Sequence, residues 1–206
     1  MATWLDNHSR ARTTIFFLWL TAGESAAWLI YNLLGVSVRQ NRFAAIILII
    51  LLSATNLTAI VSFLAWFYRA YKNLDSNGIN TSYAPGWAIG SFLVPLINWI
   101  RPYHLMEEIW RENAEMVSDS KNRPTAVLKW WWGCWVFSQL CAYLFNFGPD
   151  RNEFFAPARH VFANAGLLLH AAAAILATQV IRRISALESK TMERRRVRER
   201  SVLQYV

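Results

Sequence analysis

The chain has 206 residues, of which 55% are hydrophobic and 17% are charged, and its formal net charge is +8. Soluble domains carry about 25% charged residues, so this composition excludes most soluble classes and indicates a membrane protein. Eight basic and three acidic residues lie between positions 182 and 206, so the tail carries a net charge of +5 out of the total of +8. The two cysteines, Cys134 and Cys141, form neither a disulfide framework nor a zinc pattern.

Four apolar stretches are long enough to cross a bilayer, which takes about 20 mostly apolar residues in a helix. They cover residues 13–36, 43–67, 126–147 and 160–181. Short charged links join the first stretch to the second and the third to the fourth, which predicts two helical hairpins. Asp6 and the length of the first stretch argue against a cleaved signal peptide, so we expect this helix to stay in the mature protein.

A fifth apolar segment, residues 86–100, is too short to cross comfortably. Its 15 residues would form a helix about 22 Å long, against a hydrocarbon core about 30 Å thick. Pro95 lacks the amide proton that an interior helical turn needs, so we predict a broken or re-entrant helix. The backbone groups freed by the break would have to face protein or water.

Residues 102–117 show the pattern of an amphipathic helix at the membrane interface. The apolar side consists of Leu105, Met106, Ile109, Trp110, Met116 and Val117, and the polar side of His104, Glu107, Glu108, Arg111 and Glu115. The sequence therefore predicts an all-α integral membrane protein with a single membrane domain over residues 1–206. It would have four transmembrane helices, a short broken or re-entrant helix, an amphipathic interfacial helix and a basic cytoplasmic tail over residues 182–206.

The distribution of Lys and Arg predicts the orientation of these spans. With four crossings and both termini in the cytoplasm, most basic residues lie inside, and only Arg39, Arg42, Arg151 and Arg159 lie outside. A fifth crossing by residues 86–100 would move four more basic residues to the outer face; whether this segment crosses stays open. In the four-crossing arrangement an aromatic belt near one face would consist of Trp66, Trp99, Trp110, Trp130, Trp131, Trp132 and Trp135.

A group of motifs runs through the central third of the chain. It reads W-F-Y-R-A at 66–70, N-L at 73–74, A-P-G-W-A-I-G at 84–90, P-L-I-N at 95–98 and R-P-Y at 101–103. This pattern closely resembles the bacterial multi-helix membrane family catalogued as domain of unknown function four-three-two-eight. The resemblance implies a bacterial inner-membrane protein with helical spans, and it brings no established activity, substrate or catalytic residue.

The residues of this motif suit a module that packs closely and breaks a helix. Gly86 and Gly90 form a small-x-x-x-small face that would let another helix approach. Pro95 would free carbonyls about one turn earlier, Asn98 is spaced to donate to them, and Pro102 follows the break. Arg69, at the predicted end of the second span, would cap the last carbonyls or bind lipid phosphates. The module is either a rigid helix-turn insertion or a ligand-facing broken helix of the kind that transporters use.

A polar layer is predicted at mid-depth in the four spans, where aligning their centres brings Glu24, Asn56, Gln139 and His170 to nearly the same level. A carboxylate at this depth is costly unless it is paired, so Glu24 is a functional candidate with His170 as its partner. Asn56 and Gln139 would hydrogen-bond across helices. Either the four residues fix helix register, or Glu24 and His170 share a proton that moves during a transport cycle.

The tail contains a dense basic cluster of Arg194, Arg195, Arg196, Arg198 and Arg200, and the fourth span is expected to continue into it as a helix. Such clusters are attracted to anionic headgroups, so the expected partner is the lipid bilayer, and nucleic acid is not expected. A homo-oligomer or a membrane-protein partner is also expected to pack on the glycine face.

No catalytic or cofactor motif is recognisable, so no catalytic residue, cofactor or metal is predicted. His104, Glu107 and Glu108 suit a solvated helix face better than a metal site. We expect a non-enzymatic scaffold, sensor or subunit of a membrane assembly. The alternative is a small proton-coupled transporter or channel that uses the Glu24 and His170 layer, and a membrane-embedded lipid enzyme is a remote third.

Overall fold

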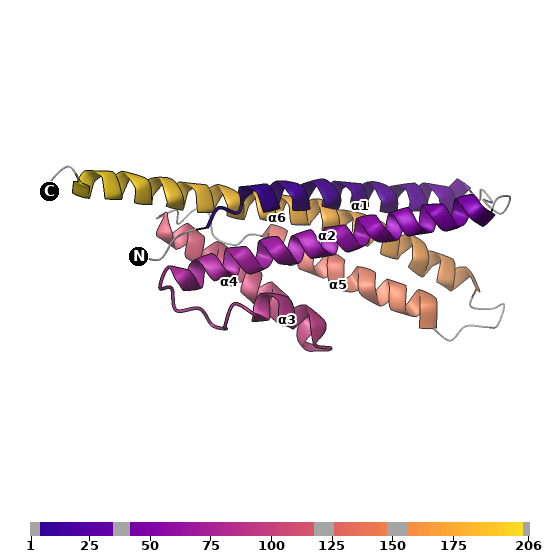
Figure 1. Cartoon of the computed structure of the whole chain (residues 1–206). Coiled ribbons are helices and arrows are strands. Elements are labelled where there is room, and N and C mark those ends of the chain that lie inside the picture. Colours follow the sequence, from indigo (N-terminus) through magenta and orange to yellow (C-terminus); the bar gives the residue numbers. More distant parts are fainter. Residues whose placement is uncertain (1–4, 35–41, 118–125, 148–155, 204–206) are drawn as a thin grey trace. The chain divides into compact units, whose positions relative to one another are not determined.

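The computed structural model describes residues 5–34, 42–117, 126–147 and 156–203, and within these ranges the chain is helical and has no strand. The elements are α1 (His8–Leu34), α2 (Arg42–Ser76), α3 (Trp87–Leu93), the 3₁₀ helix η1 (Ile97–Trp99), α4 (Arg101–Met116), α5 (Ala126–Phe147) and α6 (Ala156–Leu203) (Figure 1). The predicted all-α class is therefore confirmed. Positions 35, 36 and 204–206 of the predicted segments lie outside the described residues.

Three helices are long and apolar enough to span a membrane: His8–Leu34, Ala45–Ser76 and Arg159–Val197. They include most of three of the predicted spans. The predicted span at 126–147 forms a single helix, α5, with the expected bounds. It is not among the three, because its tryptophans, Gln139 and Lys129 lower its mean hydropathy.

The chain forms two compact units. Unit 1 consists of Met1–Thr14, Ser62–Leu128 and Gln179–Val206, and unit 2 of Ile15–Val61 and Lys129–Thr178. Helices α1, α2, α5 and α6 each contribute residues to both units.

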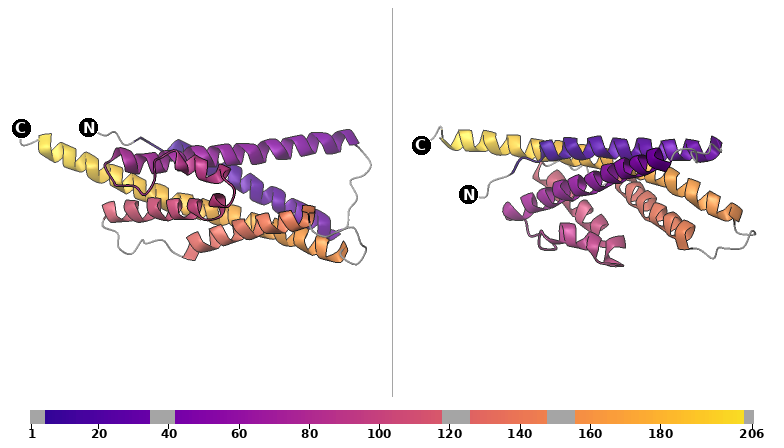
Figure 2. Two further views of the ribbon diagram at one scale, coloured as in Figure 1. Left: turned by 90° about the horizontal axis from the view of Figure 1, so that it is seen from below. Right: turned by 45° about the vertical axis from the view of Figure 1, so that its right-hand side comes forward.

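Unit 1 has a core of large, fully buried side chains from the end of α2, from α4 and from α6. These are Trp66, Phe67, Tyr71, Leu74, Leu105, Met106, Ile109, Trp110, Ile181, Ile184 and Leu187, with Leu128 at the start of α5. Much of the central motif is therefore core. Helix α3 packs on α2 through Phe92, whose ring lies 6.0 Å from the rings of Phe63 and Phe67. Figure 2 shows α3 and the turn before α4 beside the end of α2 in two further views.

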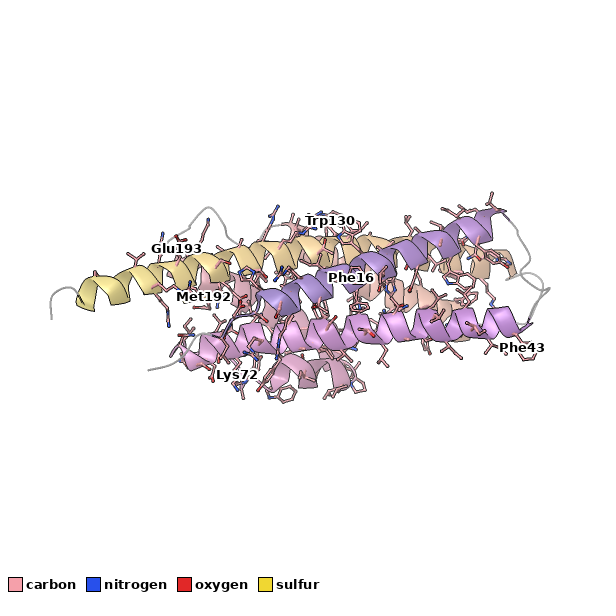
Figure 3. All side chains as sticks on the ribbon, turned by 45° about the horizontal axis from the view of Figure 1, so that its top comes forward. Phe16, Phe43, Lys72, Trp130, Met192 and Glu193 are labelled. Carbon is pink, nitrogen blue, oxygen red and sulfur yellow. The ribbon has the colours of Figure 1, made fainter. Side chains whose placement is uncertain are left out.

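Unit 2 exposes apolar side chains. In the apolar 18-residue stretch of α2 that could cross a membrane, only 6% is buried within the chain. The exposed side chains of this part of α2 include Ile46, Ile47, Ile49, Ile50, Leu51, Leu57, Ile60 and Val61. Phe43 and Trp130, which are 82% and 67% exposed, project away from the ribbon (Figure 3). Such a surface suits a lipid solvent better than water. Within the unit, α5 and α6 approach closely at Gly166, where an added Cβ would lie 3.2 Å from the Cβ of Cys141.

The segment 86–100 is interrupted near Pro95, as the sequence indicates. Helix α3 ends at Leu93, the chain turns at Leu96 with φ +66°, and η1 and α4 follow. Gly86 precedes α3 instead of lying inside it. At the C-terminus, α6 continues without interruption through the predicted tail to Leu203.

The amphipathic helix predicted over residues 102–117 is present as α4 (Arg101–Met116), but its surroundings and part of the aromatic belt differ from those expected. The apolar side of α4 is buried within unit 1, so it is not free to lie on headgroups as an interfacial helix would. Glu108, assigned to the polar side of that helix, is 6% exposed. Trp66 and Trp110 are fully buried in the core, so they cannot belong to a membrane-facing aromatic belt. In each case the side chains are buried because α2, α4 and α6 pack on one another through these faces.

Candidate functional site

A buried carboxylate organises the central motif of unit 1. Glu108 of α4 accepts a hydrogen bond from the Tyr71 hydroxyl of α2 at 2.8 Å. Its other oxygen accepts from the Ser82 amide at 2.7 Å and from the Ser82 hydroxyl at 2.9 Å. The Tyr83 amide donates to the Tyr71 oxygen at 3.1 Å. The network therefore ties the loop before α3 to two helices.

This network satisfies a carboxylate that burial would otherwise penalise heavily. Tyr71 is fully buried and Glu108 nearly so, while Ser82 and Tyr83 lie at the surface of the loop. Glu108 was expected on the polar side of its helix and is instead a buried residue. Its position in the sequence could have indicated burial. Glu108 lies three residues after Leu105 and next to Ile109, so on a helix it falls on the same face as these apolar residues.

The loop is also held by an arginine stacked between two rings. The guanidinium of Arg101, at the start of α4, lies 4.6 Å from the Tyr83 ring centroid and 4.2 Å from that of Trp87. Cation–π contacts of this kind stabilise the loop and keep the charge at the surface. Trp87 and Arg101 both belong to the motif, and their contact joins its A-P-G-W-A-I-G segment to its R-P-Y segment.

A second polar cluster clamps the N-terminal segment onto α2 and α6. Asn73 accepts from the Leu5 amide at 3.1 Å and donates to the Leu5 carbonyl at 2.9 Å. It also donates to Glu188 of α6 at 3.5 Å, and both side chains are almost completely buried. Asn7 donates to the Trp66 carbonyl at 3.2 Å, and His8 contacts the Ser189 hydroxyl at 2.6 Å. The N-terminus, the end of α2 and the start of the tail are thus one packed body.

The first part of the tail is consequently a component of the core and not only a lipid anchor. Ile184, Leu187 and Glu188 are buried in unit 1. Arg195, one of the predicted headgroup residues, donates to the side chain of Asn77, in the turn that follows α2. Arg194 and Arg196 are exposed, and the side chains of Arg198 and Arg200 lie outside the described part of the chain.

The predicted mid-depth layer is only partly assembled. Asn56 donates to Glu24 at 2.7 Å and to the Leu52 carbonyl at 2.9 Å. His170 is half-buried and Gln139 is exposed. Among the described residues of unit 2, no hydrogen bond or ion pair joins Glu24 to His170 or to Gln139. The layer therefore reduces to a Glu24–Asn56 pair.

The remaining motif residues have local roles that differ from those predicted. No described atom lies within 4 Å of a Cβ added at Gly86, and at Gly90 the nearest is the ring of Trp87 at 3.7 Å, so no helix of this chain packs on these glycines. The Asn98 amide oxygen is buried without a partner, and its side chain makes no described hydrogen bond to the carbonyls near Pro95. Pro102 is buried in the first turn of α4.

Arg69 does not cap a helix end, because α2 continues to Ser76. On α4, His104 and Glu107 form a loose exposed pair with 3.9 Å between Nδ1 and Oε2. Burial raises the pKa of Tyr103, and the neighbouring Glu107 carboxylate raises it further. Because Glu108 faces the core, these acidic residues do not converge with His104 on a metal site.

Comparison with known proteins identifies the family. The chain belongs to the family described as Domain of unknown function (DUF4328), whose model matches residues 32–186. The matched range contains the Glu108 network, the Arg101 stack and Asn73. Neither the curated proteins nor the solved structures give a significant match.

Proposed function

We propose that this protein is a multi-pass protein of the bacterial inner membrane that acts as a non-enzymatic scaffold or subunit of a membrane assembly. The observation that carries the proposal is the exposure of α2: only 6% of its apolar 18-residue stretch is buried within the chain. A helix that is apolar and exposed over most of its circumference needs lipid, or another membrane helix, as its surroundings.

Unit 1 supports a topology with four crossings. Leu5 at the N-terminus is bonded to Asn73 at the end of α2, and His8 contacts Ser189 in α6. Both termini and the end of the second helix are then on one side, so α1 and α2 cross as one hairpin and α5 and α6 as another. Since Ser82 and Glu108 are hydrogen-bonded at 2.7 Å, the chain between them returns to its starting side without crossing. The positive tail favours the cytoplasm for that side.

The open glycine at the start of α3 is our candidate partner contact. A Cβ added at Gly86 would meet no described atom of a neighbouring element within 4 Å, so the position has room for a side chain to begin. Small residues let membrane helices approach closely. A second copy of this chain or another membrane protein would pack there.

The test compares the assembly of Gly86→Leu with that of the wild type by native mass spectrometry from lipid nanodiscs. Gly23→Leu, inside α1 and likewise with nothing within 4 Å of an added Cβ, is the control. The proposal expects the complex to be lost in Gly86→Leu and kept in Gly23→Leu, with thermal unfolding unchanged in both. Unchanged assembly in Gly86→Leu would contradict the scaffold role of this face.

A second candidate function, proton-coupled transport, is favoured by the Glu24–Asn56 hydrogen bond of 2.7 Å in the apolar part of unit 2. Intramembrane carboxylates commonly mark proton or ion pathways. This candidate expects pH-driven flux in proteoliposomes that disappears in Glu24→Gln. A scaffold would keep its assembly, and show no flux, in both forms.

A further inference from the structure

The turn between α3 and α4 carries large apolar side chains on its outside. Leu93 is 74% exposed, Leu96 is 81% exposed and Ile100 is 63% exposed. Val94 and Trp99 are also exposed, by 37% and 48%. We refer to these five residues as the apolar tip. Turns in water are usually built from polar residues, so an apolar turn indicates a different surrounding.

The backbone holds the apolar tip outward. Leu96 has φ +66°, a left-handed conformation that residues with a Cβ seldom adopt. The amide of Ile97 donates to the Pro95 carbonyl at 2.8 Å, and that of Trp99 donates to the Leu96 carbonyl at 3.2 Å. These bonds fix the turn that presents the most exposed leucine. Strained conformations of this kind recur at functional sites.

The chemistry of the segment favours lipid over a protein or a charged ligand. No charged residue occurs from Ser76 to Ile100. The first charge is Arg101, which is stacked on Tyr83 and Trp87 at the edge of the apolar tip. Tryptophan, tyrosine and arginine at the border of an apolar surface are typical of the membrane interface.

The packing of α3 places the apolar tip near the end of a span. Phe92, which immediately precedes it, packs at 6.0 Å on Phe63 and Phe67. These two phenylalanines are the last turn of the second span as predicted from the sequence, residues 43–67. Four residues of helix cover about 6 Å, so with that predicted bound the contact would lie near the border between acyl chains and headgroups.

We propose that the apolar tip inserts into the bilayer leaflet at the boundary of the α2 span without crossing it, and that phospholipid acyl chains are its occupant. This inference rests on the proposed function, because it requires α2 to cross the same bilayer. The tip would act as a third type of membrane contact, beside the crossing helices and the basic tail.

The experiment uses the full chain with Cys134 and Cys141 replaced by alanine, reconstituted in nanodiscs of phosphatidylethanolamine and phosphatidylglycerol. A spin label is attached at Leu96→Cys, and its collision rates with oxygen, which concentrates in lipid, and with a water-soluble nickel chelate are measured. Leu57→Cys, 62% exposed in the α2 span, is the lipid control, and Glu115→Cys, exposed on α4, is the water control.

The proposal expects the ratio of oxygen to nickel collisions at Leu96 to be several-fold higher than at Glu115 and to approach that at Leu57. A nickel-accessible label at Leu96, with Leu57 still in lipid, overturns the insertion while leaving the proposed function intact. A label at Leu96 that is shielded from both reagents also overturns it, in favour of a protein contact. A nickel-accessible label at Leu57 overturns the proposed membrane crossing itself, and the insertion with it.

Discussion

Replacing Glu108 by alanine should destabilise unit 1 strongly. The substitution leaves the Tyr71 hydroxyl and the Ser82 amide, now 2.8 and 2.7 Å from their acceptors, without a partner. Each unsatisfied donor costs about 1–3 kcal/mol, and relief of the buried carboxylate offsets part of this sum. We therefore expect a loss of about 2–4 kcal/mol, a large share of the 5–15 kcal/mol that is typical for a domain.

The assay is chemical unfolding of the detergent-solubilised full chain, followed by tryptophan fluorescence, because Trp66 and Trp110 lie in the core of unit 1. Glu108→Gln keeps one acceptor oxygen and should lose only about 1 kcal/mol. Glu115→Ala, at an exposed carboxylate on the same helix, is the matched control and should change stability by less than about 0.5 kcal/mol. If Glu108→Ala unfolds like this control, the carboxylate does not hold the loop against the two helices.

Three further substitutions test the other contacts. Asn73→Ala removes both hydrogen bonds to Leu5 and should cost about 2 kcal/mol and speed limited proteolysis of the N-terminus; unchanged cleavage would refute the clamp. Arg101→Gln loses two cation–π contacts and should lower the free energy of unfolding by about 1 kcal/mol. An unchanged free energy of unfolding would mean that these contacts do not stabilise the loop. Gly166→Leu should lower the free energy of unfolding by about 1–3 kcal/mol, because a Cβ added there would lie only 3.2 Å from the Cβ of Cys141 on α5. Gly23→Leu, where nothing lies within 4 Å of an added Cβ, should unfold like the wild type.

Apolar length and helix-breaking chemistry were sufficient to predict most of the helices. Continuous apolar stretches predicted α1, α2, α5 and α6, and Pro95 predicted the interruption between α3 and α4. The end of α2 was harder to place, because residues 68–76 are polar enough to end a span but continue as helix into unit 1. An apolar window shows where a span can lie and not where its helix stops.

The sites were harder to predict because they depend on pairings between distant segments. Glu24 and Asn56 of the predicted polar layer are hydrogen-bonded to each other, but depth along a helix does not fix which way His170 faces. Glu108 was assigned to solvent because a charged residue is usually exposed. Its burial depends on the Tyr71 and Ser82 donors, whose hydrogen bonds offset the desolvation of the carboxylate. Such partners, 37 and 26 residues away, leave no local signal in the sequence.

In the proposed topology four helices cross the membrane and both termini lie on the same, cytoplasmic side. The most direct measurement uses two pairs of fusion proteins. In one pair, a reporter that is active only in the cytoplasm is fused to the N-terminus or to the C-terminus. In the other pair, a reporter that is active only outside the cytoplasm is fused at the same two positions. With four crossings we expect cytoplasmic activity at both ends. Activity on opposite sides would contradict it, since an odd number of crossings is incompatible with the Leu5–Asn73 and His8–Ser189 contacts in one unit.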